Sequence, residues 1–361
     1  LFVNIEELGG NNGITNVPKL TLFGFHIGDS DDLFYLIWIV VVLAILSLKF
    51  LLDSRMGRAI RSLRGGAVMI EAFGVNTAML KMWIFLYAAL LAGVSGWMYA
   101  HFVQFVSPTS FSLNVSIEYF FMAIIGGAGS PIGALVGASV FVALKQILQE
   151  LLPTVIGRAG EFEIIFFGIL VVLLLHHARR GIVPLAARLW RSAPVRMPDA
   201  HHRWPRRPLP ERPAPSPGSA LLEVEGLSKQ FGGLTAVNGV SFTLAAGEIV
   251  GLIGPNGAGK STMFNLISGV LPPSKGEIRF LGQGIDGRSS HKIARLGVAR
   301  SFQHAILRPG MSVLENVAIG AHLRGRRGIV PSLLRLDRRD EAALLAEAAR
   351  QLERVGLAES A

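Results

Sequence analysis

The sequence predicts a multi-helix transmembrane segment followed by a soluble α/β domain that holds a phosphate-binding loop. Apolar residues make up 51% of the chain, its mean hydropathy is +0.47, and long apolar blocks are concentrated before residue 178. Blocks of that length are typical of helices that cross a bilayer. A glycine-rich loop at Gly254–Thr262 lies between a strand-like and a helix-like run. The fold class therefore changes within the chain.

We expect a transmembrane part at residues 1–187, a linker at 188–219 and a nucleotide-binding domain at 220–361. The linker carries seven arginines, two acidic residues and eight prolines, so it is not expected to form a packed core. Its charge suits anionic lipid head groups, and lipid is an expected partner. No aromatic–basic platform accompanies the charge, so nucleic acid is not expected. The chain has no cysteine, which excludes disulfides and thiolate metal sites.

A membrane span needs about 20 apolar residues. Five spans are expected, near 33–52, 83–102, 115–128, 131–149 and 162–177. Arginines in the loop 53–80, and Arg179 with Arg180, mark one side of the membrane, which is the cytoplasmic side by the positive-inside rule. An even number of crossings must separate them, so the short segment 115–128 is expected to cross.

The membrane part also contains candidate functional residues. Gly129, Gly133 and Gly137 recur at helical spacing and are expected to allow close helix contact, with a transport path as the alternative. Glu118 is expected at the outer membrane boundary, as a snorkelling residue or part of a pathway. In the loop 56–75, Arg58 and Arg61 share a helix face, which a lipid phosphate or a groove on a soluble partner could receive; a merely solvated loop is the third possibility.

The chemistry of the second part is predicted by a P-loop. An apolar run at 248–253, expected to be a strand, leads into Gly254, Pro255, Asn256, Gly257, Ala258, Gly259, Lys260, Ser261 and Thr262, and a helix is expected from Met263. Glycines let backbone N–H groups turn towards phosphates, and a helix N-terminus adds a favourable dipole. Lys260 would neutralise the β- and γ-phosphates, and the Ser261 hydroxyl would ligate Mg²⁺. ATP and Mg²⁺ are the expected cofactors.

The P-loop, followed about forty residues later by Arg300-Ser301-Phe302-Gln303, resembles an ABC-transporter ATPase. The resemblance implies that Gln303 touches Mg²⁺ and the attacking water, and that Phe231 stacks on adenine. Four further stretches resemble the branched-chain amino acid importers, with a second permease subunit ahead of the first ATP-binding subunit. These are Leu227–Val237, Gly10–Thr15, Gly57–Asn76 and Gly126–Gly133. Fusion of the two in one chain departs from the family's separate subunits.

The resemblance implies a coupling helix in 56–76 that docks near Gln303 on an ATPase domain. It also implies a second permease subunit, a second ATP-binding subunit and an extracytoplasmic substrate-binding protein, in a bacterial inner membrane. Branched-chain or other apolar amino acids are the expected substrates. Urea or short amides, and less readily an exporter half-transporter or a membrane-anchored P-loop kinase, are the alternatives. The signature loop, Walker B aspartate, catalytic glutamate and switch histidine are not recognised after Gln303, so both parts are expected to be incomplete and the chain inactive alone.

Overall fold

The computed structural model describes most of the chain in two compact units. The described residues are 13–22, 25–27, 30–127, 129–156, 168–169, 172–173, 176, 181–183, 185–186, 213–302, 307–308 and 310–357. One unit comprises residues 1–49 and 87–197, and the other comprises 50–86 and 198–361. The loop between the first two long helices therefore belongs to the same unit as the P-loop domain.

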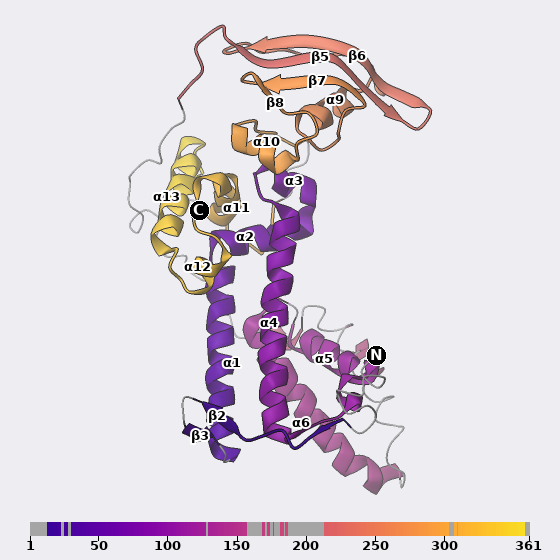
Figure 1. Ribbon diagram of the computed structural model, residues 1–361, viewed down its shortest axis with the longest axis vertical. Helices are drawn as coiled ribbons and strands as arrows, with labels where there is room; N and C mark the ends of the chain where they lie inside the picture. Colours follow the sequence, from indigo (N-terminus) through magenta and orange to yellow (C-terminus); the bar gives the residue numbers. More distant parts are fainter. Residues whose placement is uncertain are drawn as a thin grey trace. The chain divides into compact units, whose positions relative to one another are not determined.

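The first unit is built from apolar helices (Figure 1). Within the described residues, three helices are long and apolar enough to cross a membrane, and they contain the ranges 33–52, 83–102 and 131–149. The predicted span 162–177 lies mostly outside the described residues. The helices are α1 (Ser30–Leu52), α4 (Thr77–Val103), α5 (Leu113–Gly126) and α6 (Pro131–Ile156), and the short strands are β1 (Ile14–Thr15), β2 (Leu20–Leu22), β3 (Phe25–Ile27) and β4 (Phe105–Val106).

Helix α5 is shorter than the others and begins at a defined cap. The side chain of Ser112 accepts a hydrogen bond from the backbone N–H of Val115, which fixes the first turn. Its 14 residues rise about 21 Å, against about 30 Å for a hydrocarbon core. A crossing by 115–128 thus stays a prediction that depends on the residues flanking the helix.

Close packing of α5 on α6 depends on glycine. A Cβ at Gly137 would lie 2.0 Å from the carbonyl oxygen of Met122, and one at Gly126 would lie 1.7 Å from that of Gly133. Such contacts bring two helix backbones together in the way that small residues do in membranes. The packing interpretation holds for Gly133 and Gly137. Gly129 precedes α6 and faces open space, so its inclusion on the same helix face was wrong.

Glu118 is not isolated on α5. Its Oε1 accepts a hydrogen bond from Lys145 Nζ of α6 at 2.7 Å, and both side chains are about one-third exposed. The pair neutralises two charges on neighbouring apolar helices, as ionisable residues in membrane segments usually require.

The P-loop domain contains a four-stranded antiparallel sheet in the order β6-β5-β7-β8. Strands β5 (Ala220–Phe231) and β6 (Leu234–Ala245) form a long hairpin, β7 (Lys275–Phe280) pairs with β5, and β8 is Gln283–Gly284. Helices α9 (Lys260–Ile267) and α10 (Ser290–Leu296) lie against this sheet (Figure 1). Their Met263, Leu266 and Ile293 share a core with Val224 and Ile278 of the strands.

The run 248–253 does not form the strand that its apolar pattern predicts. Its residues are unpaired, and Ile249 and Ile253 are 97% and 93% exposed. A continuous apolar strand is stable when neighbouring strands satisfy its backbone and both faces are covered. The described sheet has no strand beside this run. The strand predicted from its apolar pattern is therefore not formed.

The remaining helices belong to two sequence regions that pack together. The loop after α1 forms α2 (Arg55–Ser62) and α3 (Ala67–Ala72), and the C-terminal region forms α11 (Val313–Gly320), α12 (Ile329–Leu333) and α13 (Arg338–Arg354). Leu51, Ala59, Ile70 and Leu80 of the loop region share a buried core with Ile329. The loop is therefore a structural part of the second unit.

Candidate functional site

The backbone of the P-loop has the conformation that its glycines permit. Gly257 and Gly259 have φ values of +86° and +81°, in the left-handed region that favours glycine. A Cβ at Gly259 would also lie 2.2 Å from the carbonyl oxygen of Ala236 on β6. Both the turn and the close approach to the sheet thus require glycine at position 259.

Helix α9 begins immediately after this turn, at Lys260. The first backbone N–H groups of a helix have no acceptor within it, and with the helix dipole they attract anions. Lys260 bends over the loop, and its Nζ donates to the carbonyls of Gly254 and Pro255 at 2.7 Å each. Ser261 is exposed in the first turn. The geometry provides a cradle for phosphate with one cation beside it.

Phe231 lies at the end of β5, where Gly232 and Gly233 turn the chain into β6. Phe231 is 45% exposed, and the ammonium group of Lys229 lies over its ring, 5.2 Å from the centroid. Its partner in the hairpin is Leu234, two residues before the Ala236 that touches the P-loop. At about 3.3 Å per residue, that contact lies roughly 7 Å further along the strand. An adenine contact by Phe231 remains a proposal.

Gln303 lies outside the described residues, but the segment that leads to it is fixed on α9. The guanidinium of Arg300 donates to Asn265 Oδ1 at 2.8 Å and to Ser268 Oγ at 2.7 Å. It also lies over the ring of Phe302, 5.3 Å from the centroid. Arg300 thus ties the approach to Gln303 to the helix that begins at the P-loop. No pattern in the sequence marks Arg300 for this contact.

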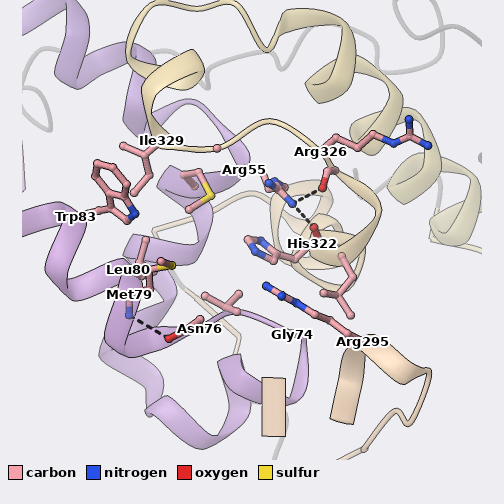
Figure 2. A pocket seen from close by; sticks show the side chains of 15 residues that line it. Arg55, Gly74, Asn76, Met79, Leu80, Trp83, Arg295, His322, Arg326 and Ile329 are labelled. Carbon is pink, nitrogen blue, oxygen red and sulfur yellow. Dashed lines mark hydrogen bonds between the residues drawn. The ribbon is translucent and has the colours of Figure 1, made fainter. Parts of the chain in front are cut away.

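Three arginines of α2 attach the loop 53–80 to the C-terminal helices of the same unit. Arg55 donates to the carbonyls of His322 at 2.5 Å and Gly325 at 2.7 Å, as Figure 2 shows. Arg61 Nη2 pairs with Glu315 Oε1 of α11 at 2.6 Å, and both side chains are about 30% exposed.

Arg58 forms the most buried of these ion pairs. Its side chain is 2% exposed and makes two hydrogen bonds to Glu341 of α13, which is 15% exposed. Two parallel bonds of this kind match the planar guanidinium to the carboxylate. Of the three roles that the sequence left open for Arg58 and Arg61, contact with a protein surface is the one observed. That surface belongs to the same chain and not to a soluble partner.

Small residues let this contact close. A Cβ at Gly74 would lie 2.2 Å from Leu323, and one at Gly325 would lie 2.7 Å from Arg55. Helix α3 meets α10, which precedes the Arg300 segment. The loop thus contacts the helix of the P-loop domain that precedes Arg300 in the sequence. Glu315, His322 and Glu341 were missed from sequence because their partners are more than 250 residues away, and no local pattern marks them.

The fold and these contacts define the class of the protein. It joins a helical membrane segment to a P-loop nucleotide-binding domain. The loop 53–80 of the membrane segment packs on the C-terminal helices of the nucleotide-binding domain. Residues 1–175 match the family described as the branched-chain amino acid transport system permease component, and residues 237–361 match the ABC transporter family. The chain therefore joins a domain of this permease family to an ATPase domain of the ABC transporter family.

Relatives of the second part carry related descriptions. The chain is 46% identical over 143 residues to the high-affinity branched-chain amino acid transport ATP-binding protein LivG of Escherichia coli, covering 39% of this chain and 56% of that protein. It is 43% identical over 143 residues to the corresponding BraF of Pseudomonas aeruginosa, with the same shares covered. The chain thus spans about half the length of the curated relatives it matches.

Among solved structures, a nucleotide-free ATP-binding cassette from an ABC transporter is 32% identical, with a TM-score of 0.32. The match covers 39% of this chain and 56% of that one. Nucleotide binding and a membrane location follow for the chain from its two families.

Proposed function

We propose that this chain is a component of an ATP-driven importer of branched-chain or other apolar amino acids in the bacterial inner membrane. The observation that carries the proposal is the ion pair between Arg58 of the permease loop and Glu341 of the ABC domain. It supports a mechanical link between nucleotide and membrane helices in one chain. The permease family and the relatives LivG and BraF support the substrate class.

At the nucleotide, the chain would act mainly by position and charge. The turn at Gly257–Gly259 aims backbone N–H groups at the phosphates, and Lys260 exchanges its two carbonyl partners for phosphate oxygens. Mg²⁺ prefers oxygen ligands, which Ser261, Gln303 and the phosphates would supply. When bound, the ion neutralises charge on the transferred phosphate. Gln303 would orient the attacking water, and Phe231 would hold adenine.

Coupling would follow from the position of α2 and α3. These helices connect α1 to α4, and they pack on α10, α11 and α13. A shift of the C-terminal helices on nucleotide binding would therefore move the ends of two apolar helices. The arginine- and proline-rich linker 188–219 would lie in the cytoplasm beside the membrane.

Hydrolysis and transport would require further subunits. In this proposal, a second permease subunit completes the membrane path, a second ATP-binding subunit supplies the opposing half of the nucleotide site, and an extracytoplasmic binding protein delivers the substrate. This division of labour leaves most of the substrate choice to the binding protein.

The test is uptake by the full-length protein with its co-encoded subunits and binding protein in proteoliposomes. ATP-dependent accumulation of radiolabelled leucine is expected, and Lys260→Ala should abolish it. Uptake of urea without leucine would replace the substrate class by the alternative. ATP-driven efflux from loaded vesicles would overturn the importer direction.

A further inference from the structure

A pocket of about 440 Å³ lies where the permease loop meets the ABC domain. Its walls come from the start of α2, the turn between α3 and α4, the first turns of α4, the end of α10 and the segment 322–329. Figure 2 shows the guanidinium of Arg295 pointing into this space beside His322, with Trp83 and Leu80 on another side. The pocket lies at the contact between the loop 53–80 and the ABC domain, and it is separate from the P-loop.

The lining is cationic. Arg55, Arg295 and Arg326 contribute to it, and none of its fifteen residues is aspartate or glutamate. The Arg326 side chain extends away from the cavity in Figure 2, so Arg55 and Arg295 are the cations that matter. Three acids outside the lining, Asp340, Glu341 and Asp337, lie near Arg55. Asp340 accepts hydrogen bonds from the backbone N–H groups of Arg326 and Arg327. Among the described lining residues, an anion would therefore meet these two guanidinium groups and no carboxylate.

His322 reports the same field independently. Burial is the main cause that lowers the pKa of its imidazole to about 3, and the positive charges of Arg55, Arg58 and Arg295 contribute to the same shift. The imidazole is therefore neutral at physiological pH, and it lines the pocket as a polar but uncharged group.

The remaining wall is apolar and belongs to a helix of membrane-spanning length. Met79, Leu80 and Trp83 lie in the first two turns of α4, and Met79 and Met82 are each more than half exposed. The rise from Thr77 to Trp83 is about 9 Å. That is close to the thickness of one head-group layer, about 5 to 8 Å. Tryptophan is also favoured at this level of a bilayer. The pocket thus combines a cationic end with an apolar end at the membrane surface.

We propose that this pocket binds the head group of an anionic phospholipid from the leaflet that faces the ABC domain. The phosphate would lie at Arg295, with Arg55 behind it, and the first part of an acyl chain would lie along Met79 and Trp83. One lipid would then contact both the start of α4 and α10. It would strengthen the docking of the loop on the ABC domain, so coupling would depend on the anionic lipid content of the membrane.

The test uses quenching of Trp83 fluorescence by lipids brominated near the head group. The full-length protein is placed in nanodiscs of unbrominated phosphatidylcholine, and brominated phosphatidylglycerol or brominated phosphatidylcholine is added in increasing mole fraction. The difference between the natural protein and Trp83→Phe isolates the signal of this tryptophan. Half-maximal quenching is expected at a mole fraction at least about fivefold lower for phosphatidylglycerol, because one basic residue near a membrane contributes about 1 kcal/mol.

Two substitutions on α10 separate a site from general attraction. Arg295→Gln removes the cation in the pocket and should abolish the preference, whereas Arg295→Lys should keep most of it. Lys292→Gln removes an exposed charge from the same helix outside the lining and should leave the preference within about twofold. Thermal unfolding midpoints of the variants control for folding.

Several results would overturn the proposal. Half-maximal quenching at the same mole fraction of the two lipids would show that the protein has no head-group preference. A preference that persists in Arg295→Gln would show that the pocket is not the binding site. An equal loss in Lys292→Gln would mean general surface attraction. Displacement by millimolar inorganic phosphate at constant ionic strength would assign the pocket to a free phosphate instead of a lipid.

Discussion

Glu341→Gln should release the permease loop from the ABC domain. The substitution keeps the shape of the side chain but leaves the guanidinium of Arg58, which is 2% exposed, without its counter-charge. Removing one partner of a buried pair typically costs about 3 to 5 kcal/mol, because an uncompensated charge stays buried. The Nε of Arg58 is also buried without a hydrogen-bond partner, so little else can compensate.

The assay uses the absence of natural cysteine. A single Ser62→Cys places a thiol at a position that is 0% exposed and whose hydroxyl lies 4.0 Å from Met311 Sδ. Maleimide can label it when the loop undocks, so the labelling rate measures the free energy of docking. A loss of 3 to 5 kcal/mol corresponds to a rate increase of roughly 100-fold to several thousand-fold.

An exposed pair supplies the matched control. Glu277 and Arg279 lie 2.8 Å apart on β7, but their side chains are about half exposed. Exposed pairs contribute about 0 to 1 kcal/mol, so Glu277→Gln should change the labelling rate by less than about fivefold. Equal labelling rates in Glu341→Gln and Glu277→Gln would refute the reasoning. Replacement of both partners, Arg58→Met with Glu341→Leu, should restore much of the protection.

Three further predictions concern the P-loop, the segment that leads to Gln303 and the docking contact at His322. Lys260→Ala should weaken binding of a fluorescent ATP analogue at least about tenfold, since it removes the cation beside the phosphates; unchanged affinity would remove Lys260 from the site. Arg300→Met should lower the kcat of ATP hydrolysis about tenfold and leave the nucleotide Kd within about twofold, because it frees the approach to Gln303 without touching the P-loop; a change in Kd alone would contradict this. His322 has a folded pKa of about 3 against about 6.5 unfolded, so its contribution to stability is complete above pH 6.5 and is lost as the pH falls towards 3. In His322→Gln the slope of unfolding free energy against pH, up to about 1.4 kcal/mol per unit, should decrease over this range, and an unchanged slope would refute the shift.

Local patterns in the sequence predicted the local parts of the structure. The P-loop turn and the helix expected from position 263 are both present, the latter within α9, because short-range sterics and periodicity determine them. The apolar blocks predicted the long helices for the same reason. The run 248–253 shows the limit of such patterns, since a strand also needs neighbours that periodicity does not supply.

Contacts between distant residues were beyond the reach of a single sequence. Arg58 and Arg61 were recognisable as a charged helix face, but their acceptors Glu341 and Glu315 carry no matching local signal. Lys145 likewise gave no indication that it would neutralise Glu118. Only the fold brings these groups together. The sequence could therefore predict docking only as one of three possible roles of the arginine face of α2.

In the proposed function, the chain's own loop transmits the action of its ABC domain to its membrane helices. The most direct measurement compares ATP hydrolysis and leucine uptake in the same proteoliposomes, for the natural protein and for Glu341→Gln in the full transporter. We predict that the variant retains most of its hydrolysis and loses most of its uptake, so that far fewer leucine molecules enter per ATP. An unchanged ratio of uptake to hydrolysis, in a variant whose loop is undocked by thiol labelling, would contradict the account.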